Sequence, residues 1–131
     1  MNLVGVISSD EQINEIIRTE IDNAFGNTFI LTFPDQGEVL EFLNFDLPEI
    51  VIFNFSDPEI DVDSIVEQIR NDSWLHNFGI IGLFDPSQYS EEDLLRKLKN
   101  VNILALLSTS RIRSHIARSI KIINDNRQII F

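Results

Sequence analysis

The 131-residue sequence contains no cysteine, which excludes a disulfide framework and any thiolate metal site. Long hydrophobic runs are also absent. The longest ones, such as residues 3–7 and 103–107, are far shorter than the roughly 20 residues that span a bilayer. The first residues have neither the basic start nor the long apolar stretch of a signal peptide. These absences predict a soluble protein of a reducing, cytoplasmic compartment, without a membrane partner.

Basic residues are scarce in most of the chain. Residues 1–95 contain two of them against twenty acidic residues, a net −18, whereas residues 96–131 contain eight against one acid, a net +7. The overall net charge of −11 argues against nucleic acid as a partner, because phosphate backbones are bound through Lys and Arg. This segregation of charge predicts a docking face on the basic C-terminal part.

Five short runs rich in Val, Ile, Leu and Phe alternate with amphipathic stretches. Continuous apolar runs of this length are typical of parallel strands that are covered on both faces. The alternation predicts a single domain with a doubly wound α/β fold. The predicted strands are residues 3–7, 28–33, 49–55, 79–84 and 103–107.

Helical periodicity fills the intervals between these strands. The hydroxyl of Ser9 is expected to cap the first helix, with Gln12 completing a capping box. The other helices are expected around residues 39–43, behind a cap at Asp61, from Ser90 and from near Ser110.

In doubly wound folds the active or binding site lies at the carboxyl ends of the strands. The residues that follow the predicted strands are mostly uncharged. They are Ser8 and Ser9 after the first strand, Asn54 at the end of the third, Phe84 and Asp85 after the fourth, and Ser108 and Thr109 after the fifth.

Four local patterns, in this order, are "VGVISSDEQI", "PEIVIFNFSDP", "FGIIGLFD" and "VNILALLSTS". Together with the order and length of the elements, they resemble the response-regulator receiver domain, the phosphoacceptor module of two-component signalling and phosphorelays. The resemblance covers nearly the whole chain. It implies a flavodoxin-like, five-stranded parallel sheet with the strand order 2-1-3-4-5.

The working residues of that family fall on replacements in this sequence. The metal-binding acidic pair falls on Ser8 and Ser9, the phosphorylated aspartate on Asn54, the phosphoryl-sensing hydroxyl on Phe84, the lysine on Ser108 and the aromatic switch residue on Ala105. An amide is not a competent nucleophile, and two hydroxyls cannot replace the carboxylates that bind magnesium. Asp57 is expected to point elsewhere along an extended chain. The sequence therefore predicts no enzyme, no cofactor, no magnesium and no other metal.

The last predicted helix is longer than the sheet requires. Residues 1–123 are predicted to form the receiver-like domain, and residues 124–131 a helical extension that could start a linker to an output domain. The resemblance implies that interaction or self-association uses this helix, either with an acidic partner surface or by parallel pairing of isoleucines. The predicted contact residues are Arg111, Arg113, Ile116, Arg118, Ile120, Lys121 and Ile123.

The resulting hypothesis is a degenerate receiver that acts as a phosphorylation-independent interaction or dimerisation module in bacterial signal transduction. One alternative is a small-molecule sensor, which would be favoured by a sizeable cavity beside Asn54. A less favoured alternative is a flavodoxin-type enzyme, although the sequence has no Gly- or Thr-rich phosphate loop.

Overall fold

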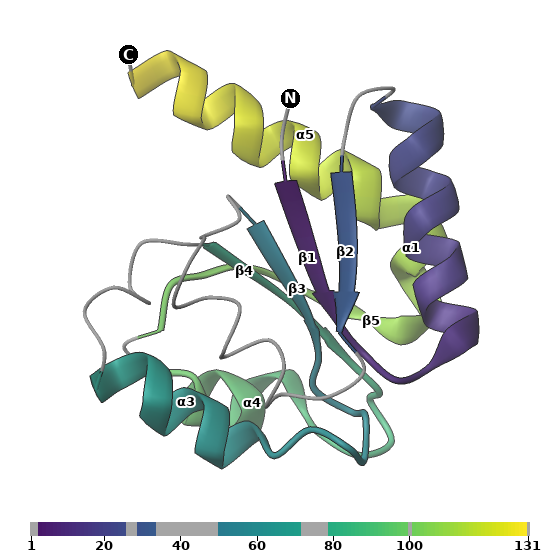
Figure 1. Ribbon diagram of the computed structural model, residues 1–131. Helices are drawn as coiled ribbons and strands as arrows, with labels where there is room; N and C mark the ends of the chain where they lie inside the picture. The colour runs from purple at the N-terminus through teal and green to yellow at the C-terminus, as the bar shows by residue number, and fades with distance from the viewer. Residues whose placement is uncertain (1–2, 26–28, 34–49, 72–78, 100, 131) are drawn as a thin grey trace.

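A five-stranded parallel sheet runs through the molecule in the order β2-β1-β3-β4-β5 (Figure 1). The computed structural model describes residues 3–25, 29–33, 50–71, 79–99 and 101–130, the last nine of these through their backbone. The predicted doubly wound topology is confirmed. The strands are β1 (Leu3–Ile7), β2 (Phe29–Phe33), β3 (Ile50–Asn54), β4 (Gly79–Phe84) and β5 (Ile103–Ser108).

Helices cover both faces of the sheet. On one face lie α1 (Glu11–Ala24) and α5 (Ile112–Ile130), and on the other lie α3 (Val62–Asn71) and α4 (Glu91–Lys97) (Figure 1). A short 3₁₀ turn (Thr109–Arg111) joins β5 to α5. The helix predicted around residues 39–43 lies outside the described residues. Within the described ranges, no helix has the length and apolar character needed to cross a bilayer.

The two faces of the sheet form two separate hydrophobic cores. Because successive side chains of a strand point to opposite faces, Ile50 and Ile52 of β3 pack toward α1 and α5, while Val51 and Phe53 pack toward α3 and α4. All residues of β3 and β4 are buried, which explains why their sequences are continuously apolar up to Asn54, the last residue of β3.

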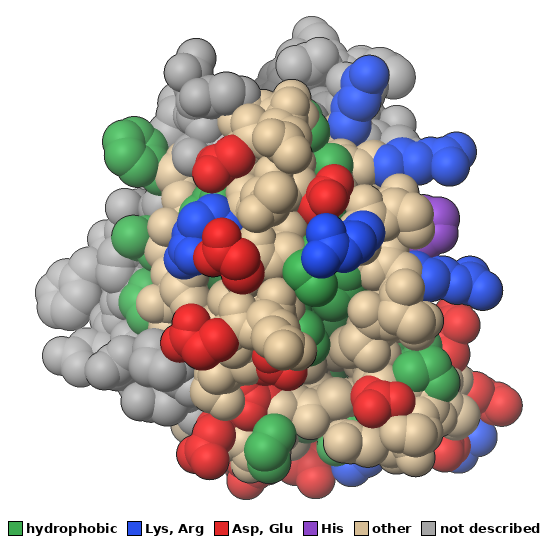
Figure 2. All heavy atoms as spheres, turned by 90° about the vertical axis from the view of Figure 1, so that its right-hand side faces the viewer, with side chains coloured by type: hydrophobic (Ala, Val, Ile, Leu, Met, Phe, Trp, Pro, Cys, Tyr) green, Lys and Arg blue, Asp and Glu red, His purple; other side chains and the backbone are tan. Residues whose placement is uncertain are grey.

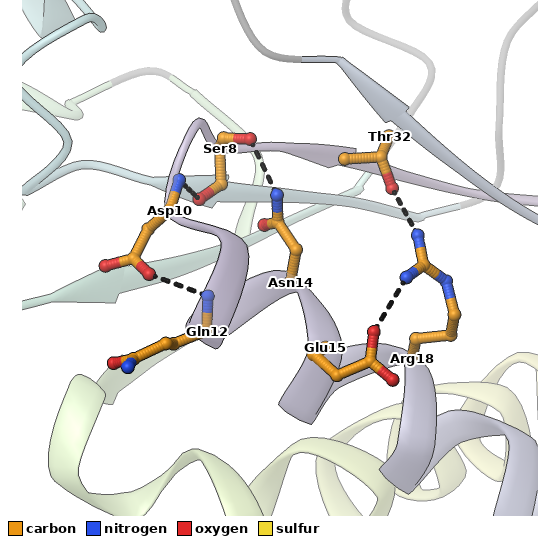
Figure 3. Close-up of polar contacts among 7 residues, drawn as sticks. All are labelled: Ser8, Asp10, Gln12, Asn14, Glu15, Arg18 and Thr32. Atoms are coloured by element: carbon orange, nitrogen blue, oxygen red, sulfur yellow. Dashed lines mark hydrogen bonds and ion pairs between the residues drawn. The ribbon is translucent and has the colours of Figure 1, made fainter.

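Helix α1 begins one residue later than the capping pattern suggested. The cap is Asp10, whose Oδ1 accepts hydrogen bonds from the backbone N–H groups of Gln12 (3.0 Å) and Ile13 (3.2 Å), as Figure 3 shows for Gln12. The prediction that Ser9 caps this helix is therefore wrong, because a carboxylate in the next position serves as the acceptor. The predicted caps at Ser90 and Asp61 do accept backbone hydrogen bonds, from Asp93 and Ser64.

The isoleucine stripe of α5 faces the sheet. Ile116 and Ile120 have exposed fractions of 0% and 3%, and they share a core with Ile17 and Ile21 of α1. The prediction that Ile116 and Ile120 are contact residues, and with it isoleucine pairing at these positions, is wrong. Their spacing also suits the buried side of a single amphipathic helix. The side chain of Ile123 lies outside the part of the chain that the structure describes.

Gly82 in β4 lies where the core leaves no room for a side chain. A Cβ atom built on Gly82 would come within 2.6 Å of Leu106 Cδ2 and 2.6 Å of Phe55 Cε2. We expect Gly82→Ala to lower the free energy of unfolding by about 1–3 kcal/mol, measured by urea denaturation, because the core must shift to admit the methyl group.

Truncating Leu106 provides the matched control for this prediction. In the double variant Gly82→Ala/Leu106→Ala, the clash with Leu106 is removed while the one with Phe55 remains, so the combined loss should be smaller than the sum of the single losses. Strict additivity of the two substitutions would contradict the packing explanation.

Candidate functional site

Ser8 and Asn54 lie against each other at the carboxyl ends of β1 and β3. Asn54 Nδ2 donates a hydrogen bond to Ser8 Oγ at 3.2 Å, and the two residues are 3% and 1% exposed. Ser8 Oγ also accepts from the backbone N–H of Asp10, and its carbonyl oxygen accepts from Asn14 Nδ2 at 2.9 Å (Figure 3). The centre of this edge is therefore a buried, neutral hydrogen-bond network.

Ser9 is held by Asp57 from across the sheet edge. Ser9 Oγ lies 2.8 Å from both carboxylate oxygens of Asp57, and the Ser9 backbone N–H donates to Asp57 Oδ2. A bond from the Asp57 N–H to the Asn54 carbonyl oxygen (3.1 Å) closes a turn directly after β3. Because the chain turns here instead of staying extended, the prediction that Asp57 points elsewhere is wrong.

The carboxylate of Asp57 is buried and fully engaged. Its residue is 4% exposed, and besides the two donors from Ser9 it accepts the backbone N–H of Glu59 at 2.9 Å. A buried carboxylate is tolerated when several donors share its charge. We name this set of contacts, made by Ser9, Asp57 and Glu59, the Ser9–Asp57 latch, since it ties the loop after β1 to the turn after β3.

The other two predicted pocket residues, Phe84 and Ser108, make different contacts. Phe84 is 7% exposed and belongs to the core under α3 and α4. Ser108 Oγ instead accepts from the Ser110 backbone N–H and lies 2.9 Å from Ser110 Oγ, at the start of the 3₁₀ turn. Ala105, at the predicted switch position, packs against the core shared by α1 and α5. Hydrogen bonds thus join Ser8 with Asn54 and Ser9 with Asp57, whereas Phe84 and Ser108 are register partners in β4 and β5 and line a neighbouring pocket.

Asp85, the acid that follows β4, is also turned outward. Hydrogen bonds from the backbone N–H and the hydroxyl of Ser87 lower the pKa of Asp85 below its ordinary value. Its own backbone N–H donates to Ser56 Oγ at 2.6 Å. Asp85 therefore shapes the loop after β4 and adds no carboxylate to the Ser8–Asn54 network.

A concave pocket of about 480 Å³ opens beside this edge, between the start of α4 and the start of α5. Its wall includes Phe84, Tyr89, Ser108, Arg111 and His115. Asn54, Ser8 and Ser9 do not line it. The cavity beside Asn54 that a small-molecule sensor would favour is therefore not the one seen here.

The chemistry available at this edge is limited. It offers hydroxyls, an amide and one carboxylate that already accepts three kinds of donor. In the described part of the chain, no group of three or more His, Asp or Glu residues is arranged to hold a metal ion. The arrangement joins two loops by hydrogen bonds and presents no free nucleophile.

The sequence does not directly predict the roles of two residues of this network, Asp57 and Asn14. An extended chain would place Asp57 away from the site, although the Asp-Pro pair that follows Ser56 is a turn signal. Asn14 lies one helical turn from the Asp10 cap. A polar side chain on the buried side of α1 is the feature of the sequence that indicates a hydrogen-bonding role for Asn14. Asn14 Oδ1 is buried and, among the described residues, finds no donor.

Comparison with solved structures identifies the fold. The sequence matches no protein-family model, and no curated protein gives a significant match. The structure, however, superposes on a two-component response regulator from Legionella pneumophila with a TM-score of 0.80 at 14% identity, over 95% of this chain and 99% of that one. The chain has the fold of a receiver domain.

Two further receiver structures are informative. The phosphorylated cyanobacterial phytochrome response regulator RcpA matches with a TM-score of 0.74 and 14% identity, over 92% of this chain and 91% of that one. The Mn²⁺-bound form of the response regulator Rcp1 matches with a TM-score of 0.72 and 12% identity, over 90% of this chain and 88% of that one. The receiver fold is thus common to a phosphorylated response regulator, a Mn²⁺-bound one and this chain.

Proposed function

We propose that this receiver-fold chain is a phosphorylation-independent signalling domain, which acts as a protein-interaction or dimerisation module in the bacterial cytoplasm. The observation that carries the proposal is the Ser9–Asp57 latch beside the neutral Ser8–Asn54 pair. The chain is a binding module and not an enzyme.

Phosphoryl transfer to a carboxylate depends on positioning and on cations that share the charge of the phosphoryl oxygens. In this chain Asn54 stands where the family resemblance places the acceptor, and an amide does not attack phosphorus as a carboxylate does. Ser8 and Ser9 stand where it places the metal-binding acids, and neither hydroxyl carries a charge. The chain therefore lacks the carboxylate nucleophile at position 54 and also the acids at positions 8 and 9 that would bind a charge-neutralising metal ion.

Asp57 does not supply a substitute acceptor. Its oxygens face the Ser9 donors and the Glu59 N–H, and only 4% of the residue is accessible. A phosphoryl donor would have to displace these bonds and expose a buried carboxylate. The Ser9–Asp57 latch holds the loop after β1 and the turn after β3 in one arrangement. A bound cation that bridged the two segments would have the same structural effect.

The outward side of α5 is basic. Arg111, Arg113, Arg118 and Lys121 are exposed, and none of them takes part in an ion pair with the residues that the structure describes. Unpaired surface cations favour acidic partners through their field. The module would therefore act through the outward side of α5.

Addition of Mg²⁺ and beryllofluoride, a mimic of the phosphoryl group, tests this proposal. We expect the amide NMR signals of Ser8, Ser9 and Asn54 to shift no more than that of the exposed Glu67, which controls for ionic strength. A saturable shift confined to the three site residues would contradict the proposal.

A further inference from the structure

The pocket of about 480 Å³ lies at the carboxyl ends of β4 and β5, between the starts of α4 and α5. In doubly wound sheets, ligands bind at this edge. The volume is within the range of pockets that hold small molecules, about 300–1,000 Å³. Neither the Ser8–Asn54 pair nor the Ser9–Asp57 latch contributes to the wall, so this pocket is a separate candidate site.

Part of the pocket wall is apolar. It consists of Phe84, Tyr89, Leu106 and Leu107. Phe84 belongs to the core under α3 and α4, and Tyr89 and Leu106 are partly buried residues that pack against that core. Two aromatic rings and two leucines offer a surface on which burial of an apolar or aromatic group is favourable.

The part of the wall contributed by the start of α5 is basic. Arg111 and His115 line the pocket, and residues four apart lie on the same side of a helical segment. Neither side chain has a hydrogen-bond or ion-pair partner within the described part of the chain. Residues 106–121 contain four bases and no acid, and Figure 2 shows Lys and Arg side chains and a His side chain along its right-hand edge. A free guanidinium in such a segment suits a carboxylate, which it can bind through two parallel hydrogen bonds.

Hydroxyl groups add further donors to the pocket. Ser108 Oγ and Ser110 Oγ are 2.9 Å apart, and both residues line the pocket. Only one of their two hydroxyl hydrogens can lie between the two oxygens, so the other can be donated to a ligand. The Tyr89 hydroxyl also has no partner among the residues that the structure describes.

Glu91 is the one acid among the residues that line the pocket. It is exposed at the start of α4, and it forms no ion pair with Arg111 although both residues face the same space. Its carboxylate repels each negative charge of a ligand. A ligand with a single negative charge is therefore favoured over one with two, such as a phosphate monoester.

We propose that this pocket binds a small aromatic monocarboxylate. The carboxylate is held by Arg111, His115 and the free serine hydroxyl hydrogen, and the ring packs on Phe84 and Tyr89. Because α4 and α5 lie on opposite faces of the sheet, a ligand that contacts the starts of both helices joins them. It also lies next to the outward side of α5, through which the module is proposed to act.

Titration of the full chain with phenylacetate, followed by NMR and calorimetry, tests the proposal. We expect saturable shifts of the amide signals of Tyr89, Arg111 and His115, whereas the signal of the exposed Glu67 should not move. The neutral analogue phenylacetamide should bind at least about tenfold more weakly, because it lacks the charge that strengthens hydrogen bonds to a guanidinium. Absence of saturable binding at about 10 mM phenylacetate, where a millimolar site would be occupied, would overturn the proposal, as would equal binding of the two compounds.

Two exposed arginines of the same segment provide a matched pair of variants. Arg111→Gln should weaken phenylacetate binding by about tenfold, whereas Arg113→Gln, at a position that does not line the pocket, should change it by less than about twofold. Equal losses would show only a general attraction to the basic segment and would overturn the assigned site.

Glu91→Gln tests the charge of the ligand. Removing this carboxylate should strengthen phenylacetate binding by about twofold or more, because it removes a repulsion. Weaker binding would contradict the inference that the site selects a single negative charge. The beryllofluoride experiment tests the phosphorylation-independent module separately, so failure of the ligand site would leave that proposal intact.

Discussion

Replacement of Asp57 with alanine is expected to lower the free energy of unfolding by about 3 kcal/mol. The substitution removes the acceptor of the Ser9 N–H, the Ser9 hydroxyl and the Glu59 N–H at a site where Asp57 is only 4% exposed. Buried donors that lose their acceptor keep the cost of desolvation. Urea denaturation followed by circular dichroism measures the loss, with an unchanged m-value as the sign that the native fold persists.

Asp63 provides the matched control for Asp57. It is an acid of α3 that pairs with Lys97 at 3.2 Å, but its side chain is 75% exposed. Asp63→Ala should change the free energy of unfolding by less than about 1 kcal/mol, since exposed ion pairs contribute little. Equal losses for Asp57→Ala and Asp63→Ala would show that the latch is not a stabilising contact.

Replacement of Ser9 with aspartate should have the second largest effect and should create a response to divalent cations. The new carboxylate would remove the hydrogen bond that the Ser9 hydroxyl donates to Asp57 and would place a second negative charge beside that buried carboxylate. We expect a loss of about 2–4 kcal/mol at neutral pH. Millimolar Mg²⁺ or Mn²⁺ should recover part of it, because an ion that binds only the folded state stabilises that state.

Ser9→Ala separates charge from the loss of the hydrogen bond. The alanine variant should be destabilised by about 1 kcal/mol and should show no recovery with either cation, and neither should the unchanged protein. Lower pH should narrow the gap between Ser9→Asp and the unchanged protein, because repulsion raises the folded-state pKa of one carboxylate and its protonation then favours folding. A melting temperature of Ser9→Asp that ignores Mg²⁺ would contradict a carboxylate pair at this position.

The strands of the sheet could be predicted from the sequence because the central strands are buried on both faces. Residues 50–53 and 80–83 are covered on both faces of the sheet. Their apolar runs therefore indicate that these strands are buried, where they lie in the chain and how long they are. The predicted bounds of β1 and β4 agree with the structure. The isoleucine spacing of α5 was more ambiguous, because a stripe that faces the sheet and a stripe that faces a partner helix have nearly the same period.

The composition of the site was predictable, but its connections were not. Ser8 and Asn54 stand at the ends of neighbouring strands, so their proximity follows from the topology. The position of Asp57 depends instead on the turn after β3, which is closed by the hydrogen bond from the Asp57 N–H to the Asn54 carbonyl oxygen. Strand periodicity does not predict this turn. The N-cap of α1 was equally hard to predict, because Ser9 and Asp10 are adjacent and both can cap a helix. Since Asp10 is the cap, the Ser9 hydroxyl can donate to Asp57 instead.

The most direct test of the account is the intact mass of the protein after incubation with acetyl phosphate and Mg²⁺. We predict no increase by one phosphoryl group, because Asn54 is not a nucleophile and Asp57 is held by Ser9 and Glu59. A hydroxylamine-labile increase of one phosphoryl group, mapped to Asp57 by peptide analysis, would show that the buried carboxylate is a working acceptor and would contradict the account.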